Sequence, residues 1–309
     1  MSEDALTSRQ REIVANAKQA FNDEDYAQAA SLLEKLYEEV QLPEVNHLLV
    51  QALYMHEEYS RARMYAGEFL NSYLGTAADW RFLLTLLLRV HDFILAHEVT
   101  AGIHEPTLRI ESETLIEGAE QAARTETAAT IKTVAKHFYH MSDDSVLEQQ
   151  HRFQAAMKLP LAEFETGAKF LLLDPYLHPL YRASILEVLQ RVQLDEPVSY
   201  RWLDEKTHEV VPAQLTPLDD DAIYQQVQKK LQDRLVDEDP VAETLLTQEV
   251  RLQLTLVYPR LNDVVTDPDE WVTGLIEIYR GDDQTVSESV SNWQRRLEQL
   301  TAELVANDD

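Results

Sequence analysis

The chain has 309 residues, of which 45% are hydrophobic and 27% charged, the balance of a folded protein large enough for one elongated domain or two compact ones. A formal net charge of −28 disfavours binding to nucleic-acid backbones and to anionic membrane surfaces. The absence of cysteine excludes disulfides, thiol catalysis and thiolate metal sites.

The N-terminal residues, MSEDALTSRQREIV, lack a charged segment followed by an apolar one, so no signal peptide is predicted. The longest apolar window, 82–96, is interrupted by Arg89, His91 and Asp92 and is too short to span a bilayer. Only 7 glycines and 11 prolines interrupt a chain rich in helix-forming residues. We therefore expect a cytoplasmic, mostly α-helical protein.

The first third of the chain repeats with a period of 33 to 34 residues. An aromatic residue recurs at this spacing, at Tyr26, Tyr59 and Phe93. An alanine follows each aromatic residue by three positions, at Ala29, Ala62 and Ala96. Two helices of about 12 residues with two short turns use about 34 residues, and a small residue is needed where paired helices cross closely. The period therefore predicts three consecutive helix pairs.

These residues resemble the tetratricopeptide repeat, which has a large residue in the first helix and an aromatic residue before the second. Repeat one, 10–42, supplies Ile13, Ala17, Tyr26, Ala29 and Leu36. Repeat two, 43–75, supplies Leu49, Tyr59, Ala62 and Phe69. Repeat three, 77–107, supplies Trp80, Leu83, Leu84, Phe93 and Ala96. The resemblance implies a right-handed α-solenoid, although Val50 and Leu84 stand where the family has a small residue.

Beyond residue 106 the period is less clear, but the pattern still predicts helices. One pair is expected at 107–124 and 126–141, a second at 145–159 and 160–175, and a further helix at 178–193. Residues 196–217 instead alternate apolar and polar side chains, with Val198, Tyr200 and Trp202 on one side of the turn and Val210 on the other. This predicts a two-stranded β-hairpin with DEKT near its turn, packed on helices.

The last third is expected to form four helices in an acidic module, because residues 218–309 contain 21 Asp and Glu against 8 Lys and Arg. Four carboxylate clusters, at 219–221, 237–240, 267–270 and 281–284, are interpreted as helix starts, where the helix dipole favours negative charge. The expected domains are a repeat array at 1–193, a β-hairpin insertion at 194–216 and a C-terminal helical module at 217–309. In this order of parts, the whole chain also resembles an uncharacterised tetratricopeptide-type family of Gram-positive bacteria.

The sequence contains no motif typical of an enzyme. No phosphate-binding glycine loop and no nucleophile elbow occur. The best histidine pair, His137 and His140, would share one helix face but needs a third ligand to hold zinc. We therefore expect no catalytic residues, no metal and no cofactor.

A stack of helix pairs presents a concave surface formed by the first helix of each pair. The register of the repeats places eight residues there: Lys18, Phe21, His47, Gln51, Tyr54, Arg81, Thr85 and Arg89. The cations stand out in an acidic chain, so an extended peptide with an acidic or C-terminal carboxylate end is the expected ligand. Alternatively, Arg81 and Arg89 pair with local carboxylates. The Asn positions of the family's known carboxylate clamp carry residues such as Lys18 and Leu48, which disfavours that form of recognition.

The function predicted from these observations is non-catalytic protein or peptide binding, as an adaptor or a chaperone-like scaffold. One alternative is a metal-dependent enzyme or regulator built around the hairpin and the C-terminal helices. Another is a self-association module that forms homo-oligomers. A peptide-sensing transcription regulator is disfavoured, because no basic helix-turn-helix precedes the repeats.

Overall fold

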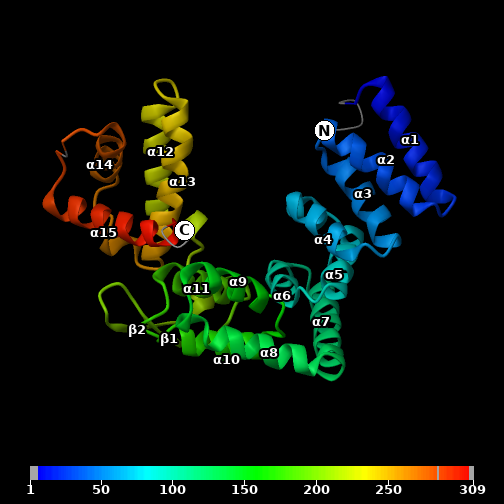
Figure 1. The fold of residues 1–309 in the computed structure, drawn as a ribbon, viewed down its shortest axis with the longest axis horizontal. Coiled ribbons are helices and arrows are strands. Elements are labelled where there is room, and N and C mark those ends of the chain that lie inside the picture. Colours follow the sequence, from blue (N-terminus) through cyan, green and yellow to red (C-terminus); the bar gives the residue numbers. More distant parts are fainter. Residues whose placement is uncertain (1–5, 284, 306–309) are drawn as a thin grey trace. The chain divides into compact units, whose positions relative to one another are not determined.

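The computed structural model describes residues 6–283 and 285–305, which form fifteen α-helices and one two-stranded sheet (Figure 1). This confirms the predicted all-α class with one small hairpin. The chain divides into two compact units, Met1–Glu126 and Thr127–Asp309. The domain boundaries expected near residues 193 and 216 both fall inside the second unit. Over the described ranges, no helix combines the length and apolar character needed to cross a membrane.

Unit 1 is a chain of helices in which each one contacts the next. Its helices are α1 (Ser8–Asn22), α2 (Tyr26–Glu39), α3 (Pro43–Met55), α4 (Tyr59–Glu68), α5 (Ala77–Arg89), α6 (Phe93–Ala101) and α7 (Pro106–Glu126). A 3₁₀ turn, Leu70–Leu74, separates α4 from α5. The pairs α1–α2, α3–α4 and α5–α6 therefore correspond to the three predicted helix pairs, with α1 beginning two residues before the predicted start of repeat one.

The turns inside these three pairs have the same backbone geometry. In each, one residue has a positive φ: Glu24 (63°), Glu57 (62°) and His91 (57°). The amide of the next residue bonds a carbonyl five positions earlier, Asp25 to Ala20, Glu58 to Leu53 and Asp92 to Leu87, each at 2.9 Å. This pairing of a left-handed residue with a 6→1 bond is the Schellman end of a helix. The period of 33 to 34 residues is thus present in the backbone as well as in the side chains.

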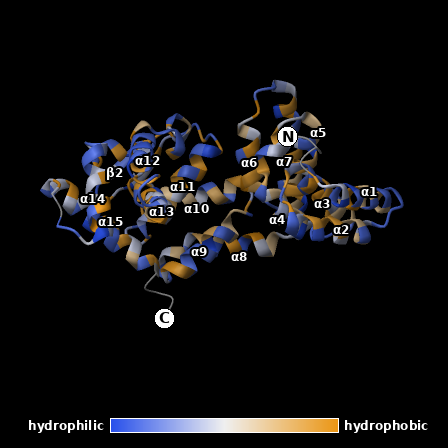
Figure 2. Ribbon diagram, turned by 90° about the horizontal axis from the view of Figure 1, so that it is seen from above, coloured by the Kyte–Doolittle hydropathy of each residue, from blue (hydrophilic) through white to orange (hydrophobic). Residues whose placement is uncertain are grey.

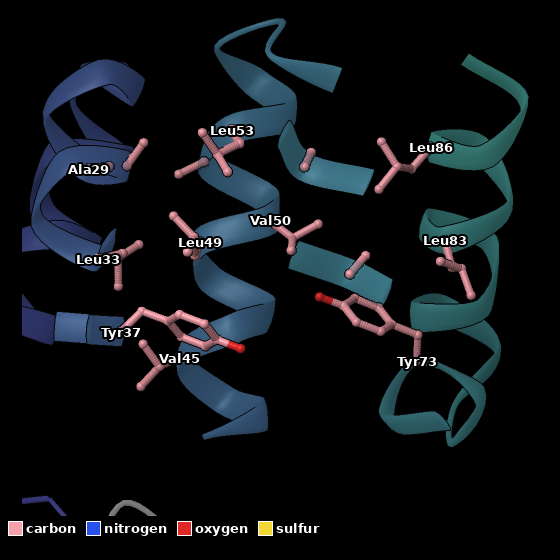
Figure 3. Packing of buried hydrophobic residues seen from close by; sticks show 14 of the residues in the cluster. Ala29, Leu33, Tyr37, Val45, Leu49, Val50, Leu53, Tyr73, Leu83 and Leu86 are labelled. Carbon is pink, nitrogen blue, oxygen red and sulfur yellow. The ribbon is translucent and has the colours of Figure 1, made fainter. Parts of the chain in front are cut away.

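The core of unit 1 lies between successive helices. The three repeat alanines, Ala29, Ala62 and Ala96, are fully buried. Figure 3 shows side chains of α3 between those of α2 and α5, with Leu49 near Leu33 on one side and Val50 toward Leu83 on the other. The three repeat alanines allow the helices to pack closely, because a larger side chain at any of them would overfill the core.

Unit 2 contains the remaining helices and the sheet. Its helices are α8 (Ala128–Tyr139), α9 (Val146–Ala156), α10 (Leu161–Leu171), α11 (Pro179–Arg191), α12 (Ala222–Leu235), α13 (Pro240–Val257), α14 (Pro268–Arg280) and α15 (Glu288–Val305). The helices of both units carry hydrophobic and hydrophilic residues side by side (Figure 2). Each helix can therefore bury one face and leave the other in water.

Three of the four carboxylate clusters lie at helix starts, as predicted. Asp221, Asp239 and Asp267 each accept a hydrogen bond from a backbone amide in the first turn of α12, α13 and α14. The prediction for 281–284 is wrong over 281–283, and residue 284 lies outside the described residues. Gly281 ends α14 in the left-handed conformation (φ 71°), so this cluster follows a helix end.

The predicted β-hairpin is present as β1 (Val198–Arg201) and β2 (Thr207–Val210), paired antiparallel with Val198 opposite Val210. Its alternate residues Val198 and Tyr200 are buried. The Arg201 amide bonds the Leu172 carbonyl at 2.8 Å just after α10. Helices thus cover one face of this small sheet, which two strands alone could not stabilise.

Candidate peptide-binding surface

The eight predicted site residues lie on the first helix of each pair: Lys18 and Phe21 on α1, three on α3 and three on α5. The structure assigns them to four different local settings. We describe these in chain order, because only some of the side chains present a surface that a ligand could contact.

A pocket of about 280 Å³ lies among α1, α2 and α3. Three predicted residues line it, Lys18, Phe21 and Gln51, together with Ala17, Asn22, Leu33 and Leu48. The Phe21 ring contacts the Tyr26 ring edge-on, with centroids 5.2 Å apart. The lining therefore combines an apolar surface of aliphatic and aromatic groups with one ammonium and two amides. This composition suits a site that holds an apolar side chain of a peptide ligand and bonds the polar main chain next to it.

His47 is held against the core and is not a surface cation. Its ring stacks on Tyr73 with centroids 3.9 Å apart, and Nε2 lies 2.7 Å from Ser72 Oγ. Burial lowers the pKa of His47 below its usual value, although the charges of Asp79 and Glu44 act in the opposite direction. Because Ser72 Oγ donates to the Phe69 carbonyl at 2.7 Å, the His47 Nε2–H donates to Ser72 Oγ. The imidazole thus ties α3 to the 3₁₀ turn.

Tyr54 and Arg89 take part in one aromatic group between α3, α4 and α5. The Tyr54 ring meets Tyr59 and Phe82 edge-on, at 5.2 and 5.4 Å between centroids. The Arg89 guanidinium lies over the Tyr59 ring, 4.8 Å from its centroid. This cation–π contact joins the end of α5 to the start of α4 and leaves the guanidinium exposed.

Arg81 is paired, as the alternative interpretation of the sequence expected. Its Nε and Nη2 donate to the two carboxylate oxygens of Glu111 on α7, at 2.8 and 2.7 Å. The same hydrogen bonds raise the pKa of Arg81 and lower the pKa of Glu111. Thr85 donates to the Arg81 carbonyl at 2.7 Å, within the helix. A bidentate partner already occupies the guanidinium that was expected to bind a ligand carboxylate.

A buried polar group beside this face was not predicted from the sequence. Asn46 is completely buried and accepts a hydrogen bond from the Tyr73 hydroxyl at 2.7 Å. Its amide donates to the Tyr65 carbonyl at 2.8 Å and to the Tyr37 hydroxyl at 3.2 Å. The hydroxyls of Tyr37 and Tyr73 point toward one another in Figure 3. A lone Asn within an apolar helix was the only signal in the sequence, and it has no characteristic spacing.

The predicted histidine pair lies at the surface of unit 2. His137 and His140 are exposed, and His140 Nδ1 is 3.4 Å from an Asp143 carboxylate oxygen. Among residues 6–283 and 285–305, no three His, Cys, Asp or Glu side chains are grouped so that they could hold a metal ion.

Comparisons with protein-family models, with curated proteins and with solved structures each found no match to this chain.

Proposed function

We propose that the chain is a non-catalytic protein- or peptide-binding protein of tetratricopeptide type, and that the pocket among α1, α2 and α3 holds one side chain of an extended peptide. The observation that carries the proposal is the meeting of Lys18 and Phe21 with Gln51 around one pocket. These residues belong to successive predicted repeats, which is how a groove along such an array would be formed.

The chemistry of the lining suggests the ligand. Leu33, Leu48 and Phe21 provide an apolar surface that an aliphatic or aromatic side chain could fill. Gln51 can bond the peptide main chain, and the Lys18 ammonium favours a neighbouring carboxylate. Lys18 is the cation that we expect a ligand carboxylate to lie near, because Lys18 lines this pocket.

The test is selection from a displayed library of short peptides against the full chain. Peptides that bind should share an apolar residue next to Asp, Glu or a free C-terminus. We expect Gln51→Ala and Lys18→Glu each to weaken these peptides by about tenfold, the loss of one or two good polar contacts. Lys35→Glu is the matched control, since Lys35 is exposed on α2 and does not line the pocket. Selected peptides that bind all four proteins equally would show that this pocket is not the site.

A further inference from the structure

A second and larger pocket, of about 590 Å³, lies within unit 2 between α13, α14 and α15. All three helices contact one another. The residues that matter for its chemistry are Leu245, Glu249 and Leu252 on α13, Ile278 and Tyr279 on α14, and Glu298 on α15. Nothing in the sequence pattern of this acidic module indicated a pocket.

The wall of this pocket is largely apolar, and some of its apolar side chains are open to water. Leu245, Ile278 and Tyr279 expose 51%, 38% and 42% of their surface. One turn before Leu245, Val241 is also exposed and extends the apolar stripe along α13. Large exposed apolar side chains gathered around a concavity, and not scattered singly, mark interaction surfaces.

The lining residues show that one strip of each of two long helices borders the pocket. Leu245, Glu249 and Leu252 follow one another at i, i+4 and i+7 and so line one face of α13. On α15, Gln294, Glu298 and Thr301 repeat the same spacing. Two long helices that border an apolar groove in this way resemble the receptors that take an amphipathic helix by its apolar face.

The charge around the pocket has one sign. Among the described residues that line the pocket, Glu249 and Glu298 are the charged ones, and none is Lys or Arg. The chain as a whole has a net charge of −28, so its overall field has the same sign as these two carboxylates. Complementarity therefore requires a partner with positive charge beside its apolar residues.

One residue of the lining, Gln253, has a buried polar atom that is unpaired within residues 6–283 and 285–305. Gln253 is only 3% exposed, and its Nε2 donates to Glu249 Oε1 at 2.8 Å. Its Oε1 forms no hydrogen bond with any part of the chain that the structure describes. An unpaired buried acceptor costs about 1 to 3 kcal/mol, so it is a position where a ligand N–H would be favoured.

We infer that this groove, bordered by α13, α14 and α15, binds a basic amphipathic helix of a partner protein. Leucine-like side chains of the partner lie against Leu245, Ile278 and Tyr279. Its Lys or Arg side chains lie beside Glu249 and Glu298, and one of its donors reaches Gln253 Oε1. This site is in a different unit from the peptide pocket of the proposed function and does not depend on it.

The probe for the test is a synthetic, fluorescein-labelled peptide of about 16 residues, with Leu along one helical face and Lys on the other. A peptide of the same composition, scrambled so that no apolar face forms, controls for simple attraction to an acidic protein. Fluorescence anisotropy with the full chain at about 0.15 M salt measures both affinities. We expect the amphipathic peptide to bind at least about tenfold more tightly than the scrambled one.

Variants then locate the site. Leu245→Ser and Tyr279→Ser should each weaken binding of the amphipathic peptide by about tenfold, because they remove apolar contact from the wall of the groove. Glu298→Gln should weaken it less and reduce the dependence on salt. Leu147→Ser on α9 is the matched control, since Leu147 is exposed to a similar degree (40%) and does not line the pocket.

Both replaced side chains are half exposed, and circular dichroism and thermal melting will verify that the variants keep the fold. Equal binding of the amphipathic and scrambled peptides would overturn the inference. So would binding of the amphipathic peptide that both folded variants, Leu245→Ser and Tyr279→Ser, leave unchanged.

Discussion

Replacing Asn46 by alanine tests whether the buried polar network holds α2, α3, α4 and the following turn together. The side chain makes three hydrogen bonds, to the Tyr37 hydroxyl, the Tyr65 carbonyl and the Tyr73 hydroxyl. Each bond contributes about 0.5 to 1.5 kcal/mol net, and a buried partner left unpaired costs about 1 to 3 kcal/mol. We therefore expect Asn46→Ala to lower the free energy of unfolding of unit 1 by about 3 to 5 kcal/mol.

A second substitution separates one bond from the whole network. Tyr73→Phe keeps the ring that stacks on His47 but removes the hydroxyl that donates to Asn46 Oδ1. The expected loss is about 1 to 2 kcal/mol. Asn71→Ala is the control for the side-chain change itself, because Asn71 is exposed in the 3₁₀ turn and should change stability by less than about 0.5 kcal/mol.

The measurement is urea denaturation read by hydrogen exchange and mass spectrometry, which distinguishes peptides of unit 1 from those of unit 2. Protection should fall across α2 to α5 in Asn46→Ala and remain unchanged in unit 2. A loss no larger than that of Asn71→Ala would refute the reasoning, since it would mean that water satisfies the network as well as Asn46 does.

Three further results are expected. Glu57→Gly should raise the free energy of unfolding by about 0.5 to 1 kcal/mol, because Glu57 has a φ of 62° and glycine adopts this conformation without steric cost. Thermal or urea unfolding measures the change, and a loss of stability would contradict this account of the turn. His178 is buried, its Nδ1 accepts a hydrogen bond from the Leu180 amide, and its Nε2–H donates to the Leu300 carbonyl. Burial lowers the pKa of His178 in the folded protein, so as the pH falls the imidazole is protonated in the unfolded chain before it is protonated in the folded one. The stability that neutral His178 contributes is present above its usual pKa of about 6.5 and is lost as the pH falls below it; urea midpoints measured between about pH 7.5 and pH 5 should decline less in His178→Asn than in the wild type. Trp202→Phe should cost about 1 to 2 kcal/mol by removing the Nε1–H bond to the Val257 carbonyl (3.1 Å), and faster exchange of the hairpin amides is the readout, with unchanged exchange counting against a docking role for Trp202.

The local features of the fold followed from the sequence because they depend on residues close together in the chain. The recurrence of Tyr26 and Ala29 after 33 and 34 residues predicted the helix pairs, and these alanines are buried where the helices meet. Alternation at Val198 and Tyr200 predicted the hairpin, since neighbouring residues of a strand face opposite sides. Asp before proline predicted the starts of α13 and α14, because a capping carboxylate acts within one helical turn.

The candidate site could be predicted only in part. Placing Lys18, Phe21 and Gln51 on the first helix of each pair required only the register of the repeats. The pairing of Arg81 with Glu111 joins residues 30 positions apart, and the burial of His47 depends on a ring that follows it by 26 positions. Whether a long cationic side chain meets a carboxylate or a ligand depends on which helix packs beside it, and periodicity carries no information about that.

The acidic C-terminal module shows most clearly which features follow from the sequence and which depend on tertiary packing. Its composition and capping residues determined four helices and their dense negative charge. Only the packing of α13, α14 and α15 left Leu245, Ile278 and Tyr279 exposed around a groove. The same packing left Gln253 Oε1 buried with no donor from the described residues. An amphipathic pattern shows that a helix has an apolar face, but the tertiary structure alone decides how much of that face the rest of the chain covers.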